Sequence, residues 1–194
     1  MPAIAKPPLH RWTYAEWDRM VASGSLDGQR VELIAGEVVE MSPQCEPHVL
    51  AISFTANILR IIFPEPAFWV RVQSPLRLGR SSDPEPDIAV VPGPPRDYLK
   101  SGHPHKAILV VEVADSSLDY DRDDKASLYA SAGVADYWIL NLLQRQCEVH
   151  RNPIADPAER FGFRYHQITV HKPGDSIAPL GALNSPVAIS EMLP

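Results

Sequence analysis

The feature that most constrains this chain is the run ILVVEVA at residues 108–114, which is apolar except for Glu112. An apolar run without alternation is typical of a central strand that is covered on both faces. A lone carboxylate in such a strand costs several kcal/mol unless it is neutralised, paired or bound to a metal. Glu112 could instead lie at the end of the strand and face solvent, or pair with an arginine. Because the apolar residues continue through Val113 and Ala114, we favour a functional role for Glu112.

The start of the chain predicts a helix followed by a hairpin. Thr13 and Glu16 form a capping box for a helix over residues 13–24, with Gly24 as its stop signal. The segment 30–43 predicts two short strands around a turn at Ala35-Gly36. We assign residues 1–11 to an N-terminal extension and residues 12–194 to a single domain.

The rest of the chain predicts a mixed α/β domain with a central β-sheet flanked by helices. Apolar spacing predicts two further helices, at 47–62 and 123–133. Short apolar runs predict strands at 68–73, 74–79, 87–91, 106–117, 135–142, 147–151 and 163–170, with a short strand and a closing turn in 174–194. The first two of these strands are expected to pair with each other. Residues 92–105 are expected to form a loop. Only the strand–helix–strand unit at 106–142 implies parallel neighbours.

Composition narrows the class of protein. The two cysteines, Cys45 and Cys147, lie far apart without metal-ligand or redox spacing, which favours a reducing compartment and predicts a cytoplasmic protein. The first ten residues have no apolar core, so we do not expect a signal peptide, and no apolar run is long enough to span a bilayer. The net charge of −6 argues against a general nucleic-acid coating protein. It is compatible with an acidic metal site beside a local basic groove.

A second carboxylate, Asp87, begins the apolar segment DIAVV directly after a proline. On its own, an aspartate in this position is common in turns and caps. Together with Glu112 it gains weight, because two neighbouring strands can each present one carboxylate to a shared point. Hard cations such as Mg²⁺ prefer oxygen ligands, usually one or two carboxylates with water and phosphate oxygens.

Three further polar residues are candidates for the same site. Lys125 is expected in the first turn of the helix that follows Glu112, where an ammonium could orient water or stabilise a phosphate, although a surface pair with Asp121 or a neighbouring aspartate is the simpler alternative. Glu32 in the hairpin could project inward as an additional metal ligand or lie on an exposed strand face. His48 near the start of the second helix could bond a carboxylate or approach a phosphate, although a lone histidine is more often structural.

Other polar and aromatic segments have simpler interpretations. The acidic stretch 115–124 is expected to be a solvated loop that caps the following helix, since it lacks the spacing of a calcium loop. Tyr129, Tyr137 and Trp138 are expected to pack in the core. The chain has no phosphate-binding glycine loop, no GxSxG nucleophile turn and no HExxH zinc motif.

Two segments, EPDIAVV at 85–91 and VVEVADSSLDYDRDDKASLYASAGVADYWILNL at 110–142, closely resemble the Uma-two family of proposed restriction endonucleases. VELIAGEVVEMSP at 31–43, His48 and the ending ISEMLP fit the same family. The resemblance covers nearly the whole chain from about Trp12. It implies a branch of the PD-(D/E)xK nuclease superfamily, with a restriction-endonuclease-like fold. It also implies that Asp87 and Glu112 serve as metal-binding carboxylates.

One position departs from the superfamily pattern. The superfamily lysine usually lies two residues after the second acid, where this chain has Ala114. In the family that this chain resembles, the lysine lies on the following helix instead. Lys125 matches that position. Glu32 and His48 match further polar positions of the family site, and Asp121 matches a tyrosine–aspartate element with a structural role.

Two hypotheses follow from the sequence. The first is an endonuclease that hydrolyses DNA with Mg²⁺, or Mn²⁺ in its place, held by Asp87, Glu112 and the carbonyl of Val113. Lys125 would position or activate water, and a homodimer using the apolar C-terminal segment would allow both strands to be cut. Three basic residues near Asp87 could grip the DNA backbone or serve only solubility, namely Arg77, Arg80 and Lys100. The second hypothesis is a non-catalytic module on the same fold that binds nucleic acid or a protein.

Overall fold

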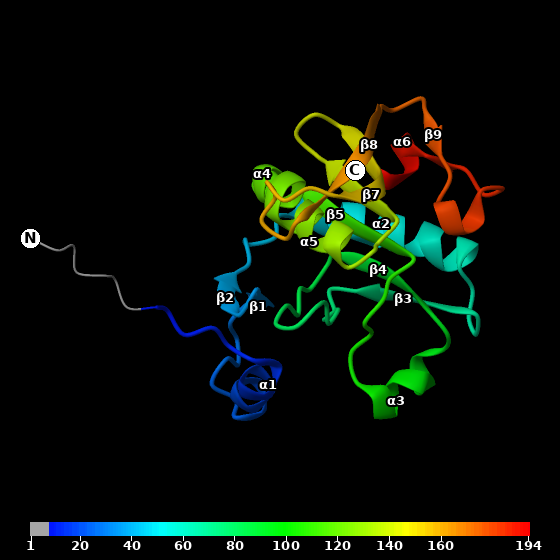
Figure 1. The fold of residues 1–194 in the computed structure, drawn as a ribbon. Coiled ribbons are helices and arrows are strands. Elements are labelled where there is room, and N and C mark those ends of the chain that lie inside the picture. The colour runs from blue at the N-terminus through cyan, green and yellow to red at the C-terminus, as the bar shows by residue number, and fades with distance from the viewer. Residues whose placement is uncertain (1–7) are drawn as a thin grey trace, which may run out of the picture.

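The apolar segments assemble into a six-stranded mixed sheet in the computed structural model, which describes residues 8–194 (Figure 1). Its strand order is β3-β4-β5-β6-β7-β8, and every neighbouring pair is antiparallel except β5 with β6. The strands are β3 (Phe68–Val72), β4 (Ile88–Pro92), β5 (Leu109–Ala114), β6 (Asp136–Asn141), β7 (Gln146–Ala155) and β8 (Phe163–His171). The predicted mixed sheet with one parallel unit is confirmed.

Helical segments cover both faces of this sheet, and each face has its own apolar core. Helices α2 and α6 contribute to one core, and α5 contributes to the other. The helical elements are α1 (Tyr14–Ala22), α2 (Glu46–Ile62), η1 (Pro95–Asp97), α3 (Tyr98–Ser101), α4 (Leu118–Tyr120), η2 (Asp121–Lys125), α5 (Ala126–Ser131), η3 (Leu180–Ala182) and α6 (Ile189–Met192). Among residues 8–194, none of the helices is both long and apolar enough to cross a membrane.

Strand β5 lies in the middle of the sheet, as its apolar sequence predicts, and all six of its residues are buried. Alternate side chains enter opposite cores. Val111 and Val113 pack with α2, whereas Val110 and Ala114 pack on the α5 side. Glu112, between the last two, therefore projects toward the α5 side of the sheet, and it is 3% exposed.

The N-terminal helix and hairpin form beside the sheet from local signals (Figure 1). The capping box of α1 is present, with Thr13 and Glu16 bonded reciprocally. Strands β1 (Val31–Ile34) and β2 (Glu37–Glu40) pair around Ala35 and Gly36, both of which have positive φ. A Cβ on Gly36 would lie 3.0 Å from the backbone of Trp12, so this turn requires glycine.

The remaining short strands lie near the C-terminus. Strand β9 (Ser176–Ile177) pairs with β10 (Val187–Ala188). Helix α6 follows directly and contributes buried side chains to the core that α2 also lines. The short strand predicted within 174–194 is confirmed, and the closing turn is a helical one. Of the predicted extension 1–11, residues 1–7 lie outside the described residues.

Three local predictions are wrong. Residues 74–79 do not form a strand, because Gln73 has a φ of 44° and the chain leaves the sheet there, so β3 pairs with β4 instead. Leu76 and Leu78, whose alternation suggested a strand, are buried as loop residues that bond to Pro84 and Ser82. The predicted loop at 92–105 contains η1 and α3, and the helix predicted at 123–133 starts five residues earlier.

His150 is a buried titratable residue on the α5 side of the sheet. It is 2% exposed, and its ring lies 5.4 Å from that of Tyr137 and 5.8 Å from that of Tyr165, measured between centroids. Its Nε2 atom has no hydrogen-bond partner among residues 8–194. Burial disfavours the charged ring and lowers the pKa of His150 from 6.5 to about 4.

We therefore expect His150 to make the fold weaker in acid. Between pH 6.5 and about 4 the unfolded chain binds a proton that the folded chain excludes, so stability falls as the pH falls through this window. The full effect of His150 is about 3 kcal/mol. Urea unfolding across this window should give a shallower pH dependence in His150→Phe than in the wild type. The same change at the exposed His166 should leave the slope unchanged, and equal slopes in wild type and His150→Phe would contradict the prediction.

Candidate active site

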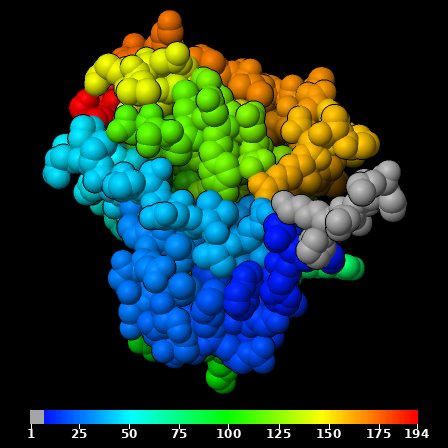
Figure 2. All heavy atoms as spheres, turned by 90° about the vertical axis from the view of Figure 1, so that its left-hand side faces the viewer, coloured from blue at the N-terminus to red at the C-terminus, as the bar shows by residue number. Residues whose placement is uncertain are grey.

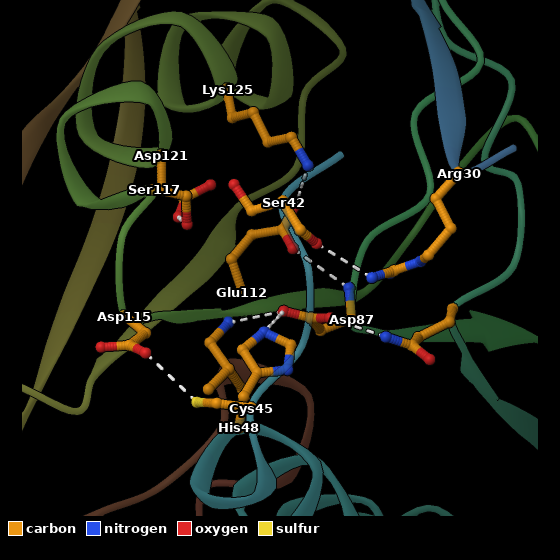
Figure 3. A network of polar contacts seen from close by, with 12 residues as sticks. Arg30, Ser42, Cys45, His48, Asp87, Glu112, Asp115, Ser117, Asp121 and Lys125 are labelled. Atoms are coloured by element: carbon orange, nitrogen blue, oxygen red, sulfur yellow. Dashed lines mark hydrogen bonds and ion pairs between the residues drawn. The ribbon is translucent and has the colours of Figure 1, made fainter. Parts of the chain in front are cut away.

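Asp87 and Glu112 are locked together where β4 and β5 stop pairing. The ladder ends at Ile88 and Val111, and the next pair in this register would be Asp87 with Glu112. Their side chains replace the missing ladder bonds. The Asp87 N–H donates to Glu112 Oε2 at 3.0 Å, and the Val113 N–H donates to Asp87 Oδ2 at 2.9 Å. Each carboxylate is thus oriented by the backbone of the other strand (Figure 3).

Lys125 reaches this pair from η2. Its Nζ atom lies 3.0 Å from Glu112 Oε1 and 3.3 Å from Glu32 Oε1, and the residue is 6% exposed. Burial acts to lower the pKa of Lys125, but the neighbouring carboxylates outweigh it and hold that pKa well above its usual value. The side chain is therefore an ammonium at neutral pH. Of the alternatives considered for Lys125, the surface ion pair is wrong, because its partners are two buried glutamates.

The position of Lys125 depends on a π-helical turn. η2 is π-helical, and both of its end residues, Asp121 and Lys125, are buried and line the same cavity. The carbonyl of Asp121 accepts from the Ala126 N–H and from the Tyr137 hydroxyl at 3.0 Å. π-Helical turns of this kind occur frequently at functional sites. The prediction that Lys125 lies in the first turn of its helix is therefore wrong, since helical structure begins at Leu118.

Asp121 is also not part of a solvated loop. It is 3% exposed, and its Oδ2 atom accepts from the Ser117 hydroxyl at 2.6 Å. Burial raises the pKa of Asp121 to about 6, against the opposing effect of Lys125. The sequence interpretation failed here because the helix start at Leu118 turns Asp121 inward, whereas a loop would have left it in solvent.

Tyr129 is a site residue that the sequence interpretation treated only as core. It is fully buried, as predicted, but its hydroxyl also donates to Glu112 Oε1 at 2.6 Å. Its spacing contained the signal, because a residue four positions after Lys125 lies on the same face of a helix. Glu112 therefore accepts hydrogen bonds from three groups, which lie directly before β4, on η2 and on α5.

Glu32 and His48 hold the two sides of this centre. Glu32 is 2% exposed and points inward, and its Oε2 atom accepts from the Glu85 N–H at 3.0 Å. His48, in the first turn of α2, has its Nε2 atom 3.3 Å from Asp87 Oδ2. Burial lowers the pKa of His48, but the hydrogen bond to and charge of Asp87, together with Val113 and Glu112, outweigh it, and the net shift is upward. All five predicted side chains are thus brought together, and Val113 lies beside them.

These side chains line a cavity of about 290 Å³ in which acidic groups outnumber basic ones. Its lysine and arginine residues are Lys125 and Arg30. Its acidic residues are Glu32, Glu40, Glu85, Asp87, Glu112 and Asp121. Burial, reinforced by Asp87 and Asp121, raises the pKa of Glu112 to about 8 despite Lys125. A cavity with this excess of negative charge favours the binding of additional cations.

The three basic residues suggested as DNA contacts do not line this cavity. Arg77 instead donates to Asp18 at 2.6 Å and Asp83 at 3.2 Å and anchors α1. Arg80 and Lys100 are exposed. Arg30, which precedes the hairpin and which the sequence interpretation missed, is the arginine in the cavity wall.

The chain matches a family model described as "Putative restriction endonuclease" (Uma2) over residues 14–186. It belongs to the Uma2 family. No curated protein sequence matches it. Among solved structures, this Uma2 protein is similar to a "putative nuclease belonging to DUF820" from Anabaena variabilis ATCC 29413. The two are 13% identical with a TM-score of 0.63, and the match covers 84% of this chain and 88% of that chain.

The family and the fold are those that the resemblance of the sequence to the Uma-two family implied. At 13% identity, the solved structure shows a shared fold, a central mixed sheet flanked by helices. Membership of the Uma2 family supports a nuclease function in general terms. The arrangement of the site residues in this chain is the basis for anything more specific.

Removing the Lys125 ammonium should destabilise this Uma2 protein strongly. Lys125→Met leaves two buried glutamates without their cation, and we expect a loss of about 3–5 kcal/mol in urea unfolding with EDTA present. Adding Glu112→Gln should recover part of the loss, because one of the unpaired charges is then absent. The control is Lys100→Met, on the exposed face of α3. A loss no larger than that of this control would show that the buried ion pairs do not hold the site together.

Proposed function

We propose that this Uma2 protein is a metal-dependent endonuclease that hydrolyses phosphodiester bonds of DNA, with Mg²⁺ as its ion and Mn²⁺ as a substitute. The observation that carries the proposal is the convergence of Asp87 and Glu112 with the buried ammonium of Lys125 in one acidic cavity. Buried ionisable groups are costly, so a cluster of them around a cavity indicates a functional site. Family membership adds support for a nuclease.

The chemistry of the donors fits a hard divalent ion. Within residues 8–194, no group of three or more His, Cys, Asp or Glu side chains is arranged to hold a metal. Mg²⁺ sites do not require such a group, because one or two carboxylates with water and phosphate oxygens are sufficient. Asp87, Glu112 and the carbonyl of Val113 would hold the ion. When bound, it would polarise the phosphate and lower the pKa of a coordinated water.

The other residues would hold these ligands in place. The raised pKa of Lys125 means that it keeps its proton at neutral pH, so it cannot serve as a general base for water. Its role is to hold Glu112 and Glu32 and to stabilise negative charge on a phosphate. His48 fixes one oxygen of Asp87 from the α2 side.

Metal binding should depend on the carboxylate pair. Isothermal calorimetry should detect Mg²⁺ or Mn²⁺ binding to the wild type and its loss in Asp87→Asn and Glu112→Gln. Asparagine keeps an oxygen for the Val113 N–H, so the first variant retains the local fold. Glu191→Gln, at an exposed position on α6, is the matched control and should bind as the wild type does.

Cleavage provides the second test. With Mg²⁺, the wild type should nick supercoiled plasmid, and Asp87→Asn and Lys125→Met should each reduce the rate by about 100-fold or more. Thermal melting identifies any variant that has lost its fold. Unchanged cleavage in both variants would exclude this site as the catalytic centre. DNA binding without cleavage in the wild type would favour a non-catalytic module on the same fold.

A further inference from the structure

The two basic side chains of the cavity differ in what they contact. Lys125 is committed to Glu112 and Glu32. Arg30 has no carboxylate oxygen within 4.0 Å among residues 8–194, and the contact it makes is a hydrogen bond from Nη1 to the Ser42 carbonyl at 2.9 Å. Figure 3 shows its side chain reaching from the hairpin toward Ser42 beside the carboxylate centre. Most of its five N–H donors therefore remain available to a ligand.

A second unused donor lies close to Arg30. Gln44 is two residues beyond the carbonyl that Arg30 contacts, and it lines the same cavity. Its Nε2 atom is buried and has no hydrogen-bond partner among residues 8–194. A buried donor without an acceptor is energetically unfavourable. A ligand that brings an acceptor to this wall of the cavity would remove that cost.

The position of Arg30 and Gln44 suits the binding of a nucleic-acid strand that lies along the mouth of the cavity. On the face shown in Figure 2, the hairpin and the linker to α2 (blue to light blue) meet the α4–α5 segment (green). Arg30 is exposed on the hairpin side, whereas Asp87 and Glu112 are buried deeper. A polyanion that approaches six acidic residues is repelled unless a cation offsets them. The planar guanidinium of arginine fits phosphate oxygens in a bidentate manner.

We propose that Arg30 and Gln44 form a phosphate-binding subsite on the hairpin side of the cavity. It holds a phosphate of the nucleic-acid strand next to the one that faces Asp87 and Glu112. The identity of the polymer rests on the proposed function, whereas the subsite itself rests on the two uncommitted donors. Because the contact lies outside the reacting centre, it contributes to substrate binding and not to the chemical step.

The test measures binding of a fluorescein-labelled duplex DNA oligonucleotide by anisotropy, with Ca²⁺ as the divalent ion. Arg30→Gln should weaken binding by about tenfold and should lower the slope of log affinity against log salt by about one. Gln44→Ala should weaken binding by about threefold without changing that slope, because the amide carries no charge. Arg80→Gln removes an exposed arginine that does not line the cavity and serves as the matched control. Each variant should retain the melting temperature of the wild type.

The outcomes separate this proposal from the proposed function. Weakened binding in Arg30→Gln without any cleavage by the wild type would support the subsite and contradict the nuclease. Cleavage in which Arg30→Gln leaves both KM and kcat unchanged would overturn the subsite and keep the nuclease. An affinity and salt slope equal to those of Arg80→Gln, or no DNA binding by the wild type, would overturn the subsite. A raised KM with unchanged kcat would support it.

Discussion

The structure of this Uma2 protein depends on providing hydrogen-bond partners for one carboxyl group, that of Glu112, inside the central strand of its sheet. Its oxygens accept from the Asp87 N–H, the Lys125 ammonium and the Tyr129 hydroxyl. These donors belong to three separate elements, so the hydrogen bonds that solvate Glu112 also fix the start of β4, the π-helical turn and α5 around it. A buried polar group of this kind is tolerated only when its hydrogen-bond partners are complete. The folded state therefore contains the geometry of the site as a condition of its stability.

The π-helical turn is held from its other side by a second buried carboxylate. Glu148 on β7 accepts from Arg122 of η2 at 2.8 and 2.7 Å, and Asn141 and Gln146 donate to the same side chain. Hydrogen bonds to the charged form lower the pKa of Glu148 despite its burial, and Arg122 is the first of these partners. The sheet face under α5 is thus lined by buried polar residues as well as apolar ones. Directional contacts can fix the register of a distorted helix, which apolar packing alone specifies less strictly.

Features that depend on residues close together in the sequence could be predicted, whereas features that depend on distant residues could not. The central strand, the capping box of α1 and the hairpin turn arise from local patterns, and each was confirmed. The pairing of Asp87 with Glu112 was also within reach, because neighbouring strands bring their ends together. The inward orientation of Asp121 could not be predicted, since it depends on Ser117 and on the hydroxyl of Tyr137 on β6, which is distant in sequence. The alternation at 74–79 misled for a related reason, because a loop can bury alternate leucines as well as a strand can.

The absence of a lysine two residues after Glu112 has a structural explanation. Ala114 occupies that position, lies on the same face of β5 as Glu112, and is 1% exposed within the core that α5 covers. A small side chain there is compatible with the helical segment packing closely against the strand, and that segment carries Lys125 to Glu112. An ammonium on the strand would be positioned by the strand alone. Supplied from η2, it reaches the carboxylates only when the helix is docked and the π-helical turn is formed. The charge balance of the site is therefore coupled to helix packing, so changes that loosen α5 should disturb the site even where they touch none of its residues.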